Sequence, residues 1–372
     1  MKITFLMPFA GLAGGNRVIA IYAQTMMERG HEVTVISQPD WRPVTLRNRL
    51  KWLISPETRP RPRTPAPWFK ELGAAHVMLE RPGPPRPEDV PDADILIATW
   101  WETAEWVAAL PAAKGRKFYL IQGYELFPYV PAERVVATYQ TDLHKIAVSQ
   151  YVRRAILENH RVTGPIDVIH NAVDLKHFDA PPRAKAKQFT VGFIYTHVEC
   201  KNVMRAIEAV TLARAKLPGL QVLAFGANHP DAAMPLPEWI RFQYNPDQDM
   251  LPGLYAQCDL WLFTSDDEGF GLPILEAMAC RTPVLATHAG AAPQLIDGRN
   301  GTLLPFDSAA FAAEIERFAG LSDQEWQAAS QAAYDTAHSY TWDNATDAML
   351  RLFSGKRPHE PPAQADLGNL PV

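Results

Sequence analysis

The sequence has few cysteines, and their spacing matches neither a metal site nor a disulfide framework. Cys200, Cys258 and Cys280 are its three cysteines, and they form no C-x-x-C pair or Cys/His cluster. Scattered thiols in odd number are typical of a reduced compartment. We therefore expect a cytoplasmic protein without structural zinc.

The 372 residues also lack a strong charge imbalance and a long apolar run. Lys+Arg number 36 and Asp+Glu 41, a net charge of −5, which gives no global nucleic-acid signature. No apolar run approaches the ~18 residues of a membrane span, so we expect a chain that is soluble, or at most peripheral on the inner membrane face. The length favours two domains, and 47% hydrophobic residues suffice for two cores.

Residues 1–13 could pass for a short signal peptide, but we expect a βαβ unit instead. Residues 3–9 predict a strand, and a helix follows with Asn16 as its N-cap and Gly30 as its C′ residue. Residues 32–37 predict the next strand, so the segment forms a βαβ unit that removal of a signal peptide would destroy.

The first strand-to-helix turn also lacks a dinucleotide fingerprint. Gly11, Gly14 and Gly15 fill the turn, but the G-x-G-x-x-G spacing is absent and no acid closes the second strand at Ser37. An NAD-dependent oxidoreductase is therefore a remote alternative. Gly11 has a second interpretation, because a glycine there would also let the helix pack closely on the sheet.

What the sequence does contain is a strand, loop, helix and strand over residues 260–287. The apolar runs 260–264 and 283–287 are typical of buried parallel strands. Gly269 and Gly271 allow a tight turn between them, and Pro273 suits the first helical position. The loop would thus deliver backbone N–H groups to a helix N-terminus in the crevice where parallel sheets bind ligands.

Two glutamates follow in this crevice, Glu268 and Glu276. An ionised carboxylate is a pure acceptor, which suits the hydroxyl groups of a sugar or a ribose. Taken singly, Glu276 could instead be an acid in the first helical turn, and Glu268 a solvated loop acid. Asp266 and Asp267 resemble an acidic metal site, but we expect them to cap the loop before the helix.

The string Glu268-Gly269-Phe270-Gly271-Leu272-Pro273, with Glu276 eight positions after Glu268, resembles the donor-site signature of retaining glycosyltransferases of family 4. The resemblance implies the GT-B fold, an α/β architecture of two Rossmann-like domains whose parallel sheets face each other across a cleft, with a C-terminal helix crossing back to the first domain. It also implies a nucleotide-diphosphate sugar as co-substrate, no cofactor and no metal. The implied donor-binding residues are Gly14, Gly15, Lys201, Asn245, Glu268, Gly269, Phe270, Gly271, Leu272 and Glu276.

The sequence departs from the family pattern at two places. Members carry histidines at two strand ends where this chain has Trp100-Trp101-Glu102 and Gln122-Gly123-Tyr124-Glu125, which leaves Gln122 as the substitute beside Glu268 and Lys201 in the catalytic set. The Gln-x-Tyr-Glu string is similar to bacterial surface-polysaccharide transferases, such as rhamnosyl- and mannosyltransferases. The expected acceptor contacts are Trp100, Trp101, Tyr124 and Glu125, although aromatic residues beside a helix are as often core.

The second departure is the absence of the arginine that family members carry near Lys201. No Arg stands at its usual spacing, and His197 is the nearest candidate. The resemblance also sets the domain boundaries. Residues 1–178 form the acceptor domain, 188–338 the donor domain and 339–353 the crossover helix, with 179–188 as linker and 354–372 as a disordered tail.

A basic, proline-rich insertion is predicted at residues 41–91. Between residues 41 and 70 eight basic residues face only Glu57, a charge of +7, with apolar residues among them. We expect a short amphipathic helix and an extended loop, which either contact an anionic membrane surface or an acidic acceptor, or form a solvated insertion. The basic residues are Arg42, Arg47, Arg49, Lys51, Arg59, Arg61, Arg63 and Lys70.

These observations predict a retaining, metal-independent hexosyltransferase of polysaccharide or glycoconjugate biosynthesis. It would move a hexose or deoxyhexose from a nucleotide-diphosphate sugar to a glycan, lipid-linked or small-molecule acceptor. The alternative is a non-catalytic GT-B scaffold that binds a glycan or a partner, which the missing His and Arg favour and the intact signature opposes.

Overall fold

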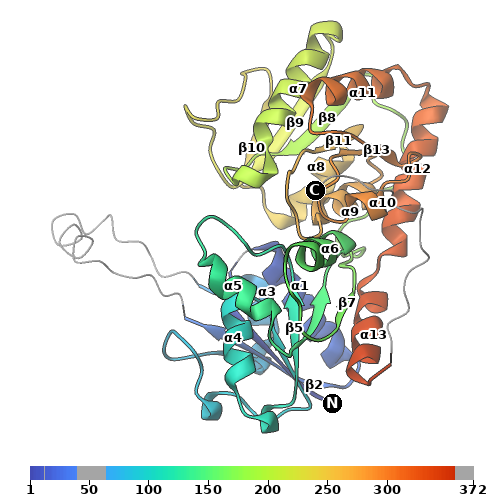
Figure 1. Cartoon of the computed structure of the whole chain (residues 1–372). Coiled ribbons are helices and arrows are strands. Elements are labelled where there is room, and N and C mark those ends of the chain that lie inside the picture. The colour runs from blue at the N-terminus through green and yellow to red at the C-terminus, as the bar shows by residue number, and fades with distance from the viewer. Residues whose placement is uncertain (12, 40–63, 357–372) are drawn as a thin grey trace, which may run out of the picture. The chain divides into compact units, whose positions relative to one another are not determined.

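The computed structural model describes residues 1–11, 13–39 and 64–356, and the chain forms two compact units (Figure 1). Unit 1 comprises residues 1–147 and 156–167, and unit 2 comprises residues 148–155 and the chain from residue 168 onward. Each unit contains one sheet with helices packed on it.

Unit 1 contains a seven-stranded sheet in the order β3-β2-β1-β4-β5-β6-β7. The strand pairs from β3 to β6 are parallel, and the order reverses direction between β1 and β4. The inner strand β1 is apolar on both faces, with Phe5 and Leu6 fully buried, as a covered parallel sheet requires. The strands are β1 Lys2–Phe9, β2 Glu32–Gln38, β3 His76–Met78, β4 Ile95–Ala98, β5 Arg116–Ile121, β6 His144–Ala147 and β7 Ile166–Val168.

The first helix shows one wrong cap prediction and one correct one. Helix α1 spans Gly14–Glu28 with Ala13 at the N-cap, so Asn16 is not the cap. Asn16 Nδ2 instead donates to Phe9 O at 2.9 Å and Gly11 O at 3.1 Å, and thereby closes the turn between β1 and α1. Gly30 has a φ of +80° and donates its N–H to Met27 O at 2.9 Å, which confirms it as the C′ residue.

The described part of the predicted insertion, residues 64–91, is continuous with the sheet. Helix α3 (Pro67–Glu71) buries Phe69 completely, and β3 pairs with β2 at the edge of the sheet. Ser37 Oγ lies 2.8 Å from His76 Nε2 across this pair. Residues 40–63 lie outside the described residues, so the amphipathic helix expected there stays a prediction, as does the disordered tail over residues 357–372.

Three further helices complete unit 1, α4 (Trp101–Ala109), α5 (Ala132–Tyr139) and α6 (Gln150–Asn159). Helix α6 begins in unit 2 and ends in unit 1. Ser149 caps its N-terminus, because Val152 N donates to Ser149 Oγ at 3.2 Å.

Unit 2 contains a six-stranded sheet in the order β10-β9-β8-β11-β12-β13, which repeats the order of the first six strands of unit 1. Its strands are β8 Thr190–Ile194, β9 Gln221–Gly226, β10 Arg241–Tyr244, β11 Leu260–Phe263, β12 Val284–Ala286 and β13 Gly301–Leu303. Its helices are α7 Val203–Lys216, α8 Leu251–Ala256, α9 Leu272–Ala279, α10 Ala292–Leu295, α11 Ser308–Gly320, α12 Asp323–Ser339 and α13 Trp342–Phe353.

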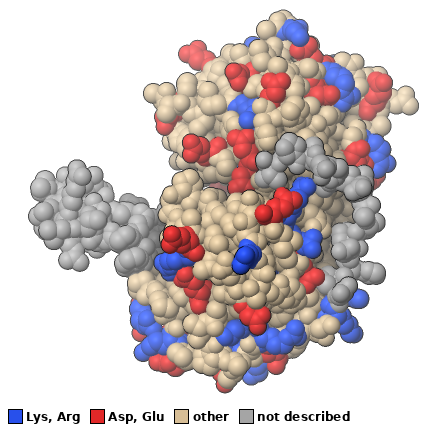
Figure 2. Space-filling view, in the orientation of Figure 1, with Lys and Arg blue, Asp and Glu red and all other residues tan. Residues whose placement is uncertain are grey.

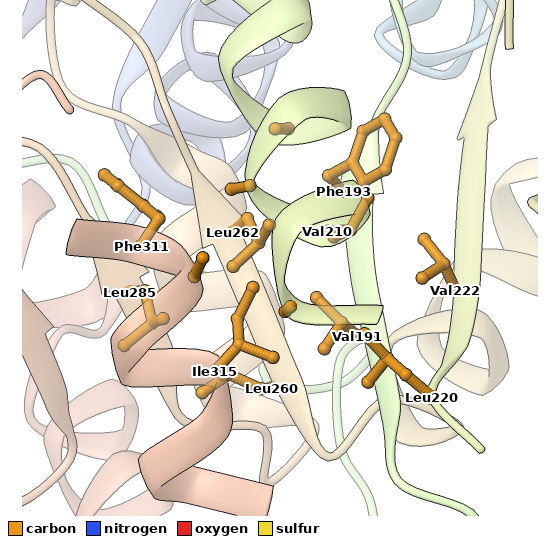
Figure 3. Close-up of a cluster of buried hydrophobic side chains, with 14 of the residues drawn as sticks. Val191, Phe193, Val210, Leu220, Val222, Leu260, Leu262, Leu285, Phe311 and Ile315 are labelled. Atoms are coloured by element: carbon orange, nitrogen blue, oxygen red, sulfur yellow. The ribbon is translucent and has the colours of Figure 1, made fainter. Parts of the chain in front are cut away.

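The core of unit 2 lies between this sheet and helices α7 and α11 (Figure 3). Val191 of β8 and Leu262 of β11 meet Val210 of α7 and Ile315 of α11 in one buried cluster. Successive residues of a strand face opposite ways, so Trp261 lies on the other face. There its ring packs against Tyr255 of α8 with centroids 4.6 Å apart, and the sheet is covered on both faces.

The segment expected as a linker, residues 179–188, is attached to unit 2 by a buried carboxylate. Asp259 is 0% exposed and accepts hydrogen bonds from Arg183 Nη1 at 2.7 Å, Ala186 N at 3.0 Å and Thr190 N at 2.8 Å. The Arg183 guanidinium also lies 4.4 Å from the centroid of the Trp326 ring. The linker is therefore part of the packed structure of this unit.

The last helix, α13, begins as predicted, with Thr341 Oγ1 accepting from Asn344 N at 3.2 Å. That it crosses back to the first domain stays a prediction. No helix in the described part of the chain has the length and apolar character that a membrane span requires. Acidic and basic side chains are interspersed over the face shown in Figure 2.

Candidate active site

The candidate site lies at the switch point of the second sheet, where the strand order reverses between β8 and β11. The loop after β8 carries Lys201, and the loop after β11 carries Glu268. Lys201 Nζ forms an ion pair with Glu268 Oε1. Two residues that are 67 positions apart thus meet in the crevice where open parallel sheets bind ligands.

The Glu268 carboxylate is held within its own loop as well. Its side chain is 11% exposed, and Ser265 Oγ donates to Glu268 Oε1 at 2.9 Å. Lys201 is the last residue of the short helical turn Glu199–Lys201, and its side chain is 33% exposed. The pair is therefore preorganised, with the cation more open to solvent than the carboxylate.

Glycines shape the loop that leads into α9. Gly271 is the N-cap residue, with a φ of +93°, and a β-carbon there would lie 2.8 Å from Phe263 Cζ. Gly290 backs the loop, because its β-carbon would lie 2.7 Å from Phe270 O and 2.8 Å from Glu268 Cβ. Leu272 and Pro273 begin the helix, and its N-cap glycine has no side chain that could accept from the first backbone N–H groups. This end of α9 offers backbone N–H groups and partial positive charge.

Glu276 is the fifth residue of α9, so the alternative that it is an acid of the first helical turn is wrong. Its carboxylate is half-buried, and Tyr255 OH donates to Oε2 at 2.8 Å. A residue of α8 therefore orients the second glutamate of the signature.

Asp266 and Asp267 are side-chain partners of neighbouring elements, which corrects the expectation that they cap the loop. Asp266 accepts from Asn202 Nδ2 at 2.8 Å and from Arg205 Nη1 at 2.6 Å. Asp267 Oδ1 accepts from Tyr151 OH at 3.0 Å, and burial raises the pKa of Asp267. No group of three or more His, Cys, Asp or Glu side chains in the described residues is arranged to hold a metal ion.

Asn245 and His197 lie near the carboxyl ends of β10 and β8, two strands that flank β9 in the sheet. Asn245 has a φ of +41° and donates its N–H to Gly226 O at 2.7 Å, directly after β10. His197 Nε2 lies 3.7 Å from Asp231 Oδ2 and 3.3 Å from Tyr195 OH. The histidine expected to replace the family arginine is thus paired with Asp231.

In unit 1, Gly14 and Gly15 begin helix α1 and Gln122 directly follows β5. A β-carbon at Gly15 would lie 2.9 Å from Gln122 Oε1, so the glycine lets the amide lie against the helix start. Gln122 Oε1 is buried and has no hydrogen-bond partner among the described residues. The structure therefore brings these predicted residues of unit 1 together.

The expected acceptor residues separate into buried and accessible ones. Trp101 is 4% exposed under the Arg134 guanidinium, 4.7 Å from the ring centroid, which favours the core interpretation for its ring. Glu125 is 1% exposed and accepts from Trp101 N at 2.8 Å and Tyr119 OH at 2.6 Å. Burial raises the pKa of Glu125 to about 8. Neither residue offers a free surface to an acceptor.

Trp100 and Tyr124 are only half-buried. Trp100 stacks on Phe127 with centroids 6.1 Å apart, and Phe127 stacks on Tyr129 at 5.4 Å. Tyr124 OH lies 2.7 Å from His160 Nε2. Tyr129 is 78% exposed, so this aromatic stack reaches the surface of unit 1.

Three contributors to the site were not predicted from the sequence: Ser149, Tyr151 and Arg205. Arg205 Nη1 donates to Thr264 O at 2.8 Å in addition to Asp266. Ser149 Oγ donates to Gly269 O at 2.6 Å. No local pattern marks these residues, because their partners lie 59 to 120 positions away.

Comparison with known families places the chain. Residues 12–177 match the model described as "Glycosyltransferase Family 4", and residues 188–320 match "Glycosyl transferases group 1". The chain belongs to glycosyltransferase family 4. The resemblance predicted from residues 268–276 is thereby confirmed.

Curated members of the family align with part of this glycosyltransferase. D-inositol 3-phosphate glycosyltransferase of Mycolicibacterium smegmatis is 31% identical over 206 residues, which are 51% of this chain and 47% of the relative. The same enzyme of Mycobacterium marinum is 33% identical over 211 residues, 50% of this chain and 44% of the relative. The alignments thus span about half the length of these relatives.

Solved structures match over nearly the full length of the glycosyltransferase. Sucrose-phosphate synthase of Thermosynechococcus elongatus has a TM-score of 0.71 at 17% identity and covers 95% of this chain and 99% of that one. HepE of Anabaena in complex with UDP has a TM-score of 0.71 at 19% identity and covers 95% and 100%. These likenesses establish the fold, which is GT-B as predicted.

Proposed function

We propose that the protein transfers a hexose or deoxyhexose from a nucleotide-diphosphate sugar to a hydroxyl acceptor. The observation that carries this proposal is the contact of Lys201 with Glu268 at the switch point, beside the N-terminus of α9. A cation and helix N–H groups suit a diphosphate, and a carboxylate suits sugar hydroxyls. One site thus offers complementary groups to both halves of such a donor.

Each part of the donor would contact a different set of the residues described above. Lys201, Gly14, Gly15 and the α9 N-terminus would hold the diphosphate, and Glu268 the sugar hydroxyls. Glu276, oriented by Tyr255, would accept hydrogen bonds from the ribose, and the turn at Asn245 would lie beside the base. Lys201 and Glu268 neutralise each other in their ion pair, and a bound donor would give each of them its own partner.

The reaction would retain the anomeric configuration. The acceptor hydroxyl attacks the anomeric carbon on the face from which the diphosphate departs, and the departing phosphate oxygen takes the hydroxyl proton. The C–O bond to phosphate breaks as the glycosidic bond forms. Lys201 and the α9 N-terminus would stabilise the charge that develops on the diphosphate, so we propose that no metal and no cofactor is required.

The acceptor would be a glycan, a lipid-linked or a small molecule of polysaccharide or glycoconjugate biosynthesis. The stack of Trp100, Phe127 and Tyr129 offers aromatic faces of the kind that contact sugar rings. Gln122, whose buried Oε1 is without a described partner, would take the place of the family histidine. The basic segment, residues 42–63, would bring the enzyme to an anionic membrane surface.

A screen of nucleotide sugars tests the proposal. Thermal shift and hydrolysis are measured with UDP-, GDP- and dTDP-sugars, starting with UDP-glucose because HepE is known with UDP and with UDP-glucose. We expect one nucleotide class to raise Tm and to be hydrolysed, and Lys201→Ala to lose both effects. Lys216→Ala is the matched control, since Lys216 forms an exposed ion pair with Glu316 in the same unit.

The outcomes separate this proposal from its rival. Binding without hydrolysis or transfer to any supplied glycan would favour a non-catalytic scaffold. An absence of binding and turnover for every nucleotide sugar would contradict the proposed function.

A further inference from the structure

In the loop after β11, each of the five consecutive residues 266–270 is bonded to another segment of the chain. Asp266 is bonded to Asn202 and Arg205, Glu268 to Lys201, and Phe270 O to Ala291 N at 2.8 Å. The remaining two residues, Asp267 and Gly269, are held by the first turn of α6. The shape of the loop is therefore fixed by contacts with several separate segments.

Ser149 supplies one of the two contacts from α6. Its hydroxyl is fully buried and donates to Gly269 O at 2.6 Å, while its oxygen accepts from Val152 N at 3.2 Å. A hydroxyl has one proton, so that proton is committed to Gly269 and the helix cap uses a lone pair. Removing the hydroxyl would thus leave both a helix cap and a loop carbonyl without a partner.

The bond to Gly269 O has a consequence for the next residue. A peptide unit is planar and trans, so fixing the direction of the Gly269 carbonyl also fixes the direction of the Phe270 N–H, which points the opposite way. Glycine restricts its own backbone less than any other residue, so the orientation of this peptide depends on an external hydrogen bond. The Ser149 hydroxyl supplies that hydrogen bond.

Tyr151 supplies the second contact. Its hydroxyl donates to Asp267 Oδ1 at 3.0 Å, and burial and the Asp267 carboxylate raise its pKa above the ordinary value, so the phenol keeps its proton. Asp267 directly precedes Glu268, whose carboxylate faces Lys201. A shift of Asp267 would therefore move the Glu268 carboxylate, which would bind the hydroxyls of the donor sugar.

We propose that Ser149 and Tyr151 are positioning residues for sugar transfer, which hold residues 267–269 so that Glu268 and the Phe270 N–H face the donor. This inference rests on the proposed function. Both residues act through the loop and not on the substrate. Their contribution is preorganisation, since a loop that must be ordered at each turnover loses affinity and rate.

Hydrogen exchange tests, without any substrate, whether Ser149 and Tyr151 hold residues 267–269 in place. Exchange is followed in peptides covering residues 266–271 for the intact protein and for Ser149→Ala, Ser149→Thr and Tyr151→Phe. Loss of one buried hydrogen bond should speed exchange there about tenfold in Ser149→Ala and Tyr151→Phe. Ser149→Thr keeps the hydroxyl and should restore protection. Thr211→Val is the control, because Thr211 bonds to Ile207 O within its own helix α7 and is far from the loop in sequence.

Kinetics with the nucleotide sugar found in the donor screen tests the catalytic part. We expect kcat/KM for the nucleotide sugar to fall about tenfold or more in Ser149→Ala and Tyr151→Phe, while affinity for the free nucleoside diphosphate changes less. A purely structural role would lower Tm and leave kcat/KM of the folded enzyme unchanged. That result, or unchanged exchange in Tyr151→Phe, would overturn the proposal. If loop exchange is faster in the variants but the intact protein has no turnover, the positioning role of Ser149 and Tyr151 for the loop would stand and the proposed function would fail.

Discussion

The Tyr255 hydroxyl donates to Glu276 Oε2 at 2.8 Å and so orients the second glutamate of the signature. Tyr255 is 1% exposed, and burial and the Glu276 carboxylate raise its pKa above the ordinary value. The phenol therefore keeps its proton and remains a donor at neutral pH. This fixed orientation makes Glu276 a defined acceptor on α9.

Replacement of Glu276 by Gln should weaken donor binding while the fold survives. If Glu276 accepts from the ribose, the change removes a charged acceptor contributing ~1.5–3 kcal/mol, or roughly 10- to 150-fold in donor affinity or rate. Isothermal titration and steady-state kinetics measure the effect, with Glu316→Gln as a control on a partly exposed acid of α11. Donor affinity and turnover equal to those of the parent protein would remove Glu276 from the ribose site.

Replacement of Gly271 by Ala should strain the entrance of α9. The residue has a φ of +93°, and an added β-carbon would meet Phe263 Cζ at 2.8 Å. We expect a loss of about 1–3 kcal/mol in the free energy of unfolding, with reduced donor affinity. Gly253→Ala in α8 is the matched control, because a β-carbon there meets nothing within 4 Å. Equal unfolding free energies for the two variants would show that the loop accommodates the strain.

Glu125 should make the stability of the protein fall as pH rises. Burial raises its pKa from 4.5 to about 8, so the folded protein holds this proton more tightly than the unfolded chain does. The contribution is fully present below pH ~4.5 and is lost as pH rises through about 8. Its size is on the order of a few kcal/mol.

The comparison of the intact protein with Glu125→Gln measures this contribution. Gln can still accept from Trp101 N and Tyr119 OH but carries no charge. Urea unfolding between pH 5.5 and 8.5 should show a steeper decline for the intact protein. Lys145, whose pKa burial lowers to about 8, titrates in both proteins, so the difference reports Glu125. Identical pH profiles would refute a protonated Glu125.

Chelation should leave transferase activity intact. Asp266 is engaged by Asn202 and Arg205, and Asp267 by Tyr151, so the two acids are held as partners of other side chains. Activity is measured in EDTA and after addition of Mn²⁺ or Mg²⁺. Activity that EDTA abolishes and Mn²⁺ restores would make Asp266 and Asp267 the first ligands to test.

The basic segment should bind anionic vesicles in a salt-sensitive way. Each Lys or Arg near such a surface contributes about 1 kcal/mol, and salt screens the attraction beyond a Debye length of ~8–10 Å. Co-sedimentation with anionic and neutral vesicles compares the intact protein with a variant in which Arg47, Arg49 and Lys51 are Glu. Negligible binding in all four cases at low salt would exclude the membrane contact.

Much of the fold could be predicted because its signals are local. Helices α6 and α7 form over residues 150–159 and 203–216, where a cap or a turn precedes each run of apolar residues at helical spacing. Helix α12 carried such a signal too, the capping box of Ser322 and Glu325, and was not predicted. Strand β3 is only three residues long within a proline-rich stretch, too short for a period to show.

The site was predictable where the family resemblance assigns its residues. The motif located Glu268 and Glu276, the resemblance located Lys201 on a separate segment, and the structure brings Glu268 and Lys201 into contact. Trp101 and Glu125 were expected as acceptor contacts, but they bond to each other in the interior of unit 1. Burial of that kind depends on how distant segments pack, which neither spacing nor composition records.

The attachment of residues 179–188 to Asp259 determines where the chain could be cut. A fragment that begins at the predicted boundary, Gln188, would lack Arg183 and leave a fully buried carboxylate without its cation. An unpaired buried charge is among the most destabilising of single changes. A fragment of the donor domain that is to fold alone must therefore include residues 179–188, with Arg183 before strand β8.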